Sequence, residues 1–147
     1  MVMTEELITD YDIRGTNETG LTIECAWNIG KATADWLPTA GSVVVAYVPT
    51  QATLANAVIE GIRLQGRNVV DAGGGDKNAA ISYIQTAGLS GAVVVSADQV
   101  SNVVTIELYQ EDGKRIEASS GLKEVYELVQ AGNFVPAAVK GEVTAIA

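Results

Sequence analysis

The regular alternation of short apolar runs with segments of helical periodicity constrains the fold of this chain more than any other feature. The longest runs are SVVVAYV at residues 42–48 and AVVVS at 92–96, and a shorter one lies at 68–72. A strand with one face in water alternates apolar and polar residues, whereas an uninterrupted apolar run is typical of a strand buried on both faces. The runs therefore predict strands of an α/β sheet with helices on both sides.

Segments with apolar residues at helical spacing lie between these runs and after them. They cover residues 22–37, 52–65, 76–87 and 122–131. Thr22 and Asp76 can cap the first and third of these helices through their side-chain oxygens, and Gly88 is placed to end the third. Strands that are joined in succession by helices predict a largely parallel sheet.

One further strand is expected over residues 103–109, where apolar and polar residues alternate and one face is more exposed. We therefore predict a three-layer α/β/α domain with a mostly parallel (mixed) sheet of four to five strands. The 147 residues suffice for a single domain, which we place at residues 1–147. Residues 133–147 show no clear period, and we interpret them as a linker-like tail.

The composition excludes several classes of function. The chain has no histidine, which excludes Ser-His-Asp and Cys-His catalysis and every His-ligated metal site. Cys25 is the sole cysteine, so neither an intrachain disulfide nor a cysteine metal cluster can form, and we expect a packing role for it. The net charge of −9 argues against nucleic acid and anionic membranes as partners.

The sequence also bears on location. No stretch approaches 18 uninterrupted apolar residues, and the N-terminal MVMTEELITD has no basic region followed by an apolar one. We therefore expect neither a membrane-spanning segment nor a signal peptide. Together with the single cysteine, these features predict a cytoplasmic protein.

Ligands of parallel α/β sheets bind at the loops after the carboxyl ends of the strands. In this chain those loops cover residues 47–52, 72–77 and 96–102. The second loop contains three successive glycines, Gly73 to Gly75, which could cradle a phosphate in front of a helix. However, it lacks the G-K-[ST] ending of a P-loop, and Asp76 would repel an anion, so a tight turn is the favoured interpretation.

The segment YDIRG at Tyr11–Gly15 resembles the opening signature of the phosphohexomutases, the phosphoglucomutase/phosphomannomutase superfamily. Segments that resemble later motifs of this family follow in order at residues 29–32, 57–61, 69–73, 91–97 and 112–114, and again in the tail. Over nearly its whole length the chain resembles the first of the family's four domains. The resemblance implies an isomerase of hexose phosphates that uses Mg²⁺. The metal-binding loop of the family lies in another domain, so we expect no metal ligand and no cofactor here.

The catalytic loop of this family resembles T-A-S-H-N-P, and its serine carries the phosphoryl group. Here Ser96–Ser101 reads SADQVS, which places Asp98 at the serine position and Gln99 at the histidine position. Residues 46–51 stand where the family has a loop with two arginines, and they contain neither. The resemblance therefore implies a degenerate loop and no catalytic residue in this chain.

The candidate residues for binding a phosphate or another ligand are Arg14, Asp98 and Gln99. Asp98 admits three interpretations: a solvated loop residue, which is favoured, a charge mimic of the phosphoserine, or a nucleophile that forms an acyl phosphate. Arg14 either contacts a phosphate or forms a structural ion pair. The ion pair is favoured because most other phosphate-binding groups of the family are missing.

These departures favour a stand-alone, non-catalytic module for binding or assembly, and we expect no activity from the chain alone. The alternatives are a fragment or subunit of a phosphohexomutase, and a sensor that binds a sugar phosphate weakly. In the four-domain family, the second domain covers one side of the first. We therefore expect this chain to form a homodimer, or to bind another protein, through apolar residues of its tail. These residues are Phe134, Val135, Val139, Val143 and Ile146.

Overall fold

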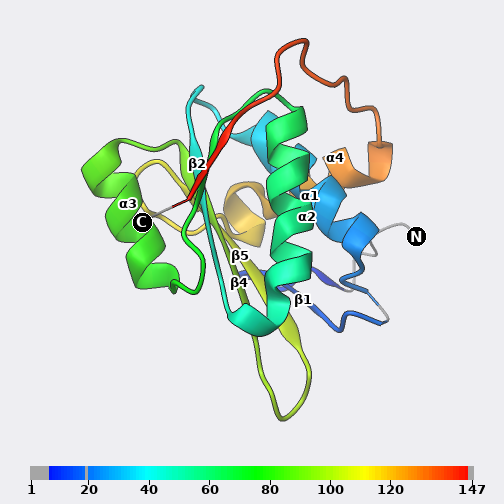
Figure 1. Ribbon diagram of the computed structural model, residues 1–147. Coiled ribbons are helices and arrows are strands. Elements are labelled where there is room, and N and C mark those ends of the chain that lie inside the picture. The colour runs from blue at the N-terminus through cyan, green and yellow to red at the C-terminus, as the bar shows by residue number, and fades with distance from the viewer. Residues whose placement is uncertain (1–6, 19, 146–147) are drawn as a thin grey trace.

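One mixed sheet of six strands forms the centre of the computed structural model, which describes residues 7–18 and 20–145 (Figure 1). The strands are β1 (Ile13–Gly15), β2 (Val43–Tyr47), β3 (Val69–Asp71), β4 (Gly91–Ala97), β5 (Val104–Gln110) and β6 (Val143–Ala145). Their order across the sheet is β1-β5-β4-β2-β3-β6. Strand β5 is antiparallel to both of its neighbours and every other pair is parallel, so five of the six strands share one direction.

The sheet therefore has six strands, and the expected number of four to five is wrong. The apolar patterns did not reveal β1 and β6, which lie at the two edges and have three residues each. All three residues of β6 are exposed, so this strand has no buried face that would leave a pattern in the sequence. Its backbone pairs with β3, where Val143 lies opposite Val69. The segment interpreted as a linker-like tail thus contributes an edge strand.

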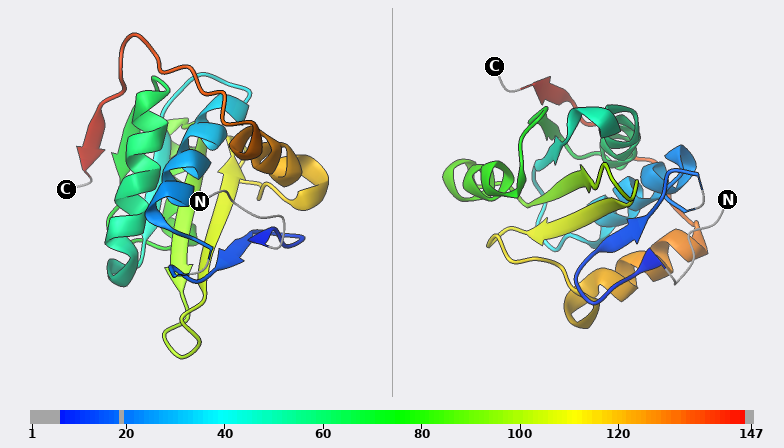
Figure 2. Two further views of the ribbon diagram at one scale, coloured as in Figure 1. Left: turned by 90° about the vertical axis from the view of Figure 1, so that its right-hand side faces the viewer. Right: turned by 90° about the horizontal axis from the view of Figure 1, so that it is seen from below.

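Helices cover both faces of the sheet, as the sequence predicted. The α-helices of the described residues are α1 (Ile23–Trp36), α2 (Ala52–Leu64), α3 (Lys77–Ala87) and α4 (Lys123–Ala131). Helices α1, α2 and α4 lie on one face and α3 lies on the other (Figures 1 and 2). Along β2, Val43 and Val45 pack with the first group of helices, whereas Val44 and Ala46 pack with α3. This burial on both faces explains why residues 42–48 form an unbroken apolar run.

The predicted helix ends are confirmed. The Thr22 hydroxyl accepts the Cys25 N–H at 3.2 Å at the start of α1, and the Asp76 carboxylate accepts the Ala79 N–H at 3.0 Å at the start of α3. Gly88 ends α3 with φ of +67°, a left-handed conformation that favours glycine. Cys25 itself is buried, and burial raises the pKa of its thiol to about 11, which suits a packing residue and not a reactive thiol.

Helices α1 and α2 pack with their backbones in direct contact. A Cβ atom at Gly30 of α1 would collide with the Val58 carbonyl oxygen of α2. Reciprocally, a Cβ atom at Gly61 of α2 would collide with the Trp27 carbonyl oxygen of α1. The two glycines therefore set the distance between the helix axes, because no larger residue fits at either position.

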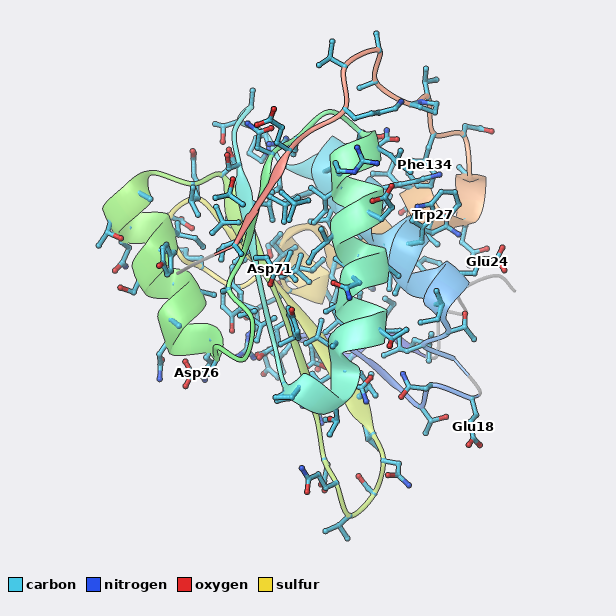
Figure 3. All side chains as sticks on the ribbon, viewed as in Figure 1. Glu18, Glu24, Trp27, Asp71, Asp76 and Phe134 are labelled. Carbon is cyan, nitrogen blue, oxygen red and sulfur yellow. The ribbon has the colours of Figure 1, made fainter. Side chains whose placement is uncertain are left out.

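Residues 132–142, which we call the strap, cross the ends of α1 and α2 on the way from α4 to β6 (Figure 2). The Ala137 and Gly141 N–H groups donate to the carbonyls of Leu64 and Arg63 at 2.9 Å each, which satisfies acceptors at the end of α2. The Lys31 ammonium lies 3.3 Å from the centre of the Trp27 ring and 5.6 Å from that of Phe134. This cation–π contact holds the start of the strap against α1 (Figure 3).

The contact between α1 and α2 yields a test of stability. We expect Gly61→Ala to lower the free energy of unfolding by about 2 kcal/mol, because overpacking against a backbone outweighs the ~1 kcal/mol that alanine adds to helix propensity. Urea unfolding measures the difference. Gly74→Ala is the control, since a Cβ atom there would lie 3.9 Å from its nearest neighbour, Pro49. A Gly61→Ala protein as stable as the unmodified chain would contradict this account of the packing.

Candidate functional site

A cavity of about 500 Å³ lies beyond the carboxyl ends of β1, β2 and β4. Its lining comprises Thr16, Asn17, Glu18, Thr50, Gln51, Ala97, Asp98, Gln99, Ser101 and Asn102. The topology explains its place. From β2 the chain passes through α2 to β3, and from β3 it returns through α3, on the opposite face, to β4. The loops after β1 and β2 lead into α1 and α2 on one face, and the loop after β4 turns directly into β5, so these three connections meet at one edge of the sheet, where ligands of α/β sheets bind.

Three loops meet at this cavity and two of them are joined directly. The Asn17 Nδ2 atom, in the loop after β1, donates to the Gln51 Oε1 atom at 3.1 Å and to the Leu21 carbonyl at 3.3 Å. Gln51 belongs to the short 3-10 helix η2 (Pro49–Gln51) between β2 and α2. The third loop is the turn at residues 98–103, which connects β4 and β5 and projects beyond the sheet (Figure 1).

Asp98 uses its carboxylate within its own turn. One carboxylate oxygen accepts the N–H groups of Val100 at 2.9 Å and of Ser101 at 3.4 Å. These backbone hydrogen bonds lower the pKa of Asp98, because they stabilise its charged form. The Asp98 carbonyl also accepts the Asn102 N–H at 2.8 Å, and Asn102 has a left-handed φ of +60°. Asp98 is thus an exposed turn residue on the wall of the cavity.

Arg14 does not line the cavity. Its guanidinium makes two hydrogen bonds to the Asp12 carboxylate, at 2.9 and 3.1 Å. Asp12 is buried and also accepts the Thr9 hydroxyl at 2.7 Å. This pairing raises the pKa of Arg14 above its ordinary value. The hydrogen bond to Asp12 is the larger cause, and the negative charge of Asp12 is the second. In this structure the Arg14 guanidinium forms an ion pair within the chain.

The other predicted positions divide between the cavity and its surroundings. Gln99 is exposed and lies on the lining beside Asp98. The glycine-rich loop at residues 72–77 is not part of the lining, and the Gly73 N–H donates to the Asp71 carboxylate at 2.9 Å in a tight turn. Asp76, which caps α3, lies across the sheet from Glu18 (Figure 3). Of the three loops that the sequence singled out, two meet at the cavity.

The loop at residues 16–18 also lines the cavity, although the sequence did not predict it as part of the site. No motif marks Thr16, Asn17 or Glu18, and they reach the cavity because β1 runs in the same direction as β2 and β4. The signal that could have found them is their position directly after YDIRG. Had that segment been recognised as a strand, its carboxyl end would have been expected at this edge of the sheet.

The lining is polar and carries negative charge. Seven of its residues bear neutral hydroxyl or amide groups, Glu18 and Asp98 are carboxylates, and Ala97 is apolar. None of the lining residues is a lysine or an arginine. An anion placed here would meet two like charges without a cationic partner, which disfavours binding of a phosphate ester.

Among residues 7–18 and 20–145, no three cysteine, aspartate or glutamate side chains are grouped closely enough to hold a metal ion. No described helix is both long enough and apolar enough to cross a bilayer.

Comparison with known proteins identifies the family. A family model described as phosphoglucomutase/phosphomannomutase, alpha/beta/alpha domain I, matches residues 5–135. This match covers most of the 147 residues and includes all three loops of the cavity. The chain belongs to the phosphoglucomutase/phosphomannomutase family and corresponds to its first domain.

Individual relatives agree with this assignment. The phosphomannomutases of Salmonella typhimurium and of Escherichia coli are each 29% identical to the chain over 128 residues, which is 86% of this chain and 28% of each enzyme. A crystal structure of a phosphoglucomutase/phosphomannomutase family protein from Burkholderia thailandensis has a TM-score of 0.84 and 20% identity. It covers 97% of this chain, whereas this chain covers 33% of it, and the likeness confirms the fold. The chain thus spans little more than a quarter of the two phosphomannomutases.

The turn at Asp98 predicts a pH dependence. A carboxylate whose pKa is lowered in the fold supports the turn above the ordinary aspartate pKa of ~3.9 and loses this role as the pH falls through the lowered value. We expect the Val100 and Ser101 amide resonances to titrate together with a midpoint below that ordinary pKa in an NMR pH series. Asp98→Asn keeps an acceptor oxygen and should remove the titration, whereas Asp98→Ala should displace both resonances at neutral pH. A midpoint at or above the ordinary value would refute the assignment.

Proposed function

We propose that this chain is a non-catalytic member of its family, a domain that binds a ligand or assembles with a partner. The observation that carries the proposal is the state of Asp98, which stands where the family resemblance places the phosphoserine. A carboxylate that accepts two backbone N–H groups is stabilised in its charged form, which makes it a weaker nucleophile. Phosphoryl transfer also requires cationic stabilisation of the transferred group, and the lining supplies none.

A second candidate function is that of a fragment or subunit of a phosphohexomutase. It is supported by the family assignment and by the share of the phosphomannomutases that the chain spans, 28% of their length. Other domains, in the same chain or another, would have to supply the nucleophile as well as the metal and cationic groups. Neither Asp98 nor Arg14 offers a substitute in the described geometry, because the first holds its turn and the second is paired with Asp12.

A sensor for sugar phosphates receives the least support. Such a sensor needs donors or cations that face the phosphate, as arginine forks and free helix N-termini do. The cavity has two carboxylates, and Arg14 is bound to Asp12 outside it. The glycine-rich loop lies elsewhere, and Asp76 occupies the N-terminus of the helix that follows it.

The first test is an enzyme assay. We expect no conversion of glucose 1-phosphate or mannose 1-phosphate by the chain with Mg²⁺, and we expect Asp98→Ser not to restore it, because cationic groups would still be missing. A coupled assay measures the product, with a full-length phosphomannomutase as the positive control. Turnover that is lost in Asp98→Ala would contradict the proposal, as would activity gained by Asp98→Ser alone.

Assembly as a homodimer is the second part of the proposal, and its support comes from the strap and from β6. Val135 and Val139 are 81% and 82% exposed, and Val143 of the edge strand is 45% exposed. An edge strand beside exposed apolar residues favours pairing with a second copy across a two-fold axis. Phe134 is partly buried against the core and Lys31, so it is not free for this contact, and Ile146 lies outside the described residues.

Sedimentation equilibrium tests the dimer. At micromolar concentration we expect a mass near twice the 15.3 kDa of the chain, because pairing would bury these valines. Val139→Lys should shift the equilibrium toward the monomer, since it places a charge in the contact. Val100→Lys is the matched control, because Val100 is 95% exposed at the tip of the β4–β5 turn. A mass near 15.3 kDa for the unmodified chain would reject the dimer.

A further inference from the structure

We propose that the cavity beyond β1, β2 and β4 binds a polyhydroxylated compound without a phosphate group, such as a free hexose. This inference rests on the proposed function, because it assigns a ligand class to the same non-catalytic site. It departs from the hexose phosphates on which the family acts. Three properties of the lining carry it: the kind of polar group, the sign of the charge, and the size and order of the space.

The polar groups of the lining match hydroxyls. Each hydroxyl of a ligand both donates and accepts a hydrogen bond, so it is best met by groups that do the same. Seven lining residues carry such groups, namely Thr16, Asn17, Thr50, Gln51, Gln99, Ser101 and Asn102. The Asn17–Gln51 bond uses the Gln51 oxygen as its acceptor and leaves the Gln51 NH₂ group available to donate to a ligand.

The charge of the lining separates a neutral ligand from a phosphorylated one. Glu18 and Asp98 are acceptors, and a carboxylate oxygen accepts hydrogen bonds from hydroxyls well. A phosphate ester carries about −1.5 to −2 charges at neutral pH and would be repelled by both side chains. Arg14 does not compensate, because its guanidinium is already paired with Asp12. The same groups therefore favour the free compound and disfavour its phosphate.

The cavity has the size of a small-molecule site, and hydrogen bonds fix the positions of its walls. Its volume of about 500 Å³ falls within the range of small-molecule sites, which is roughly 300–1,000 Å³. The Asn17–Gln51 hydrogen bond fixes two of its walls relative to each other. The third wall is ordered by the Asp98 carboxylate and by the Asp98–Asn102 backbone bond. Because the loops are ordered before binding, less conformational entropy is lost when a ligand binds.

The test is an NMR titration of the ¹⁵N-labelled full chain. Glucose and mannose are the probes, compared with glucose 1-phosphate and mannose 1-phosphate at equal ionic strength. We expect saturable shifts of the amides at 16–18, 50–51 and 97–102 with a free hexose, and at least about tenfold weaker binding of its phosphate. Gln51→Ala should abolish the shifts, whereas Gln85→Ala, at an exposed position on α3, should leave them unchanged.

A charge variant tests the preference for a free hexose separately from binding itself. Glu18→Lys should narrow or reverse the preference for the free hexose over its phosphate, because it replaces a repulsive carboxylate with a cation. Equal or tighter binding of a hexose phosphate by the unmodified chain would overturn the inference, as would the absence of shifts with both hexoses in a folded protein. Neither outcome depends on catalysis. The enzyme assay above therefore decides the proposed function independently of this titration.

Discussion

The backbone contact between α1 and α2 is the constraint on which the site depends. Gly30 and Gly61 allow each helix to touch a carbonyl of the other, and this contact fixes the relative positions of the two helices. The loop after β1 leads into α1, and the 3-10 helix η2 leads into α2. Both connections therefore arrive at the same edge of the sheet at a set separation, close enough for Asn17 to bond Gln51. Two of the three loops that line the cavity therefore lead into helices whose separation these two glycines set.

At the end of α1 that lies away from the cavity, the side chain of Arg67 bonds several backbone carbonyls. The Arg67 guanidinium donates to the carbonyls of Ala34, Leu37, Thr39 and Gly41 at 2.7 to 3.0 Å. These acceptors lie at the end of α1 and in the connection to β2, where carbonyls lack helical partners. Burial lowers the pKa of Arg67, and the four hydrogen bonds offset the desolvation of its charge. Together with the strap, which satisfies carbonyls of α2, this arrangement secures the end of the domain away from the cavity.

The charged groups near the site serve the fold. Arg14 is paired with the buried Asp12, and Asp98 holds the turn between β4 and β5. The phosphohexomutase resemblance assigns phosphate chemistry to the positions of Arg14 and Asp98, but both side chains here have partners within the chain. What remains at the cavity is a set of neutral donors and acceptors with two carboxylates. The chain thus has the fold of the family's first domain, and the chemistry of its cavity depends on the particular side chains of the lining.

Much of this protein could be predicted from residue patterns because those patterns record local physical demands. Unbroken valine runs mark strands buried on both faces, Thr22 and Asp76 cap helices through short hydrogen bonds, and the order of motifs indicates the family. Asp98 and Gln99 were placed at the site through the resemblance of residues 96–101 to the family's catalytic loop, and both line the cavity.

Only the tertiary structure decided the edge strands, the state of Arg14 and the full lining of the cavity. Strand β6 has no buried face, so its place depends on pairing with β3 from a distant part of the chain. The loop at Thr16 to Glu18 carries no motif, and it reaches the cavity because β1 shares the direction of β2 and β4. Arg14 could have faced a ligand or a carboxylate, and its choice of Asp12 depends on how β1 and the segment before it fold together. The edge strands and the cavity lining arise from contacts between residues distant in sequence or from three-dimensional direction, whereas the Arg14–Asp12 pair is local and depends on which of several partners the fold presents. None of these features leaves a periodic trace in the order of amino acids.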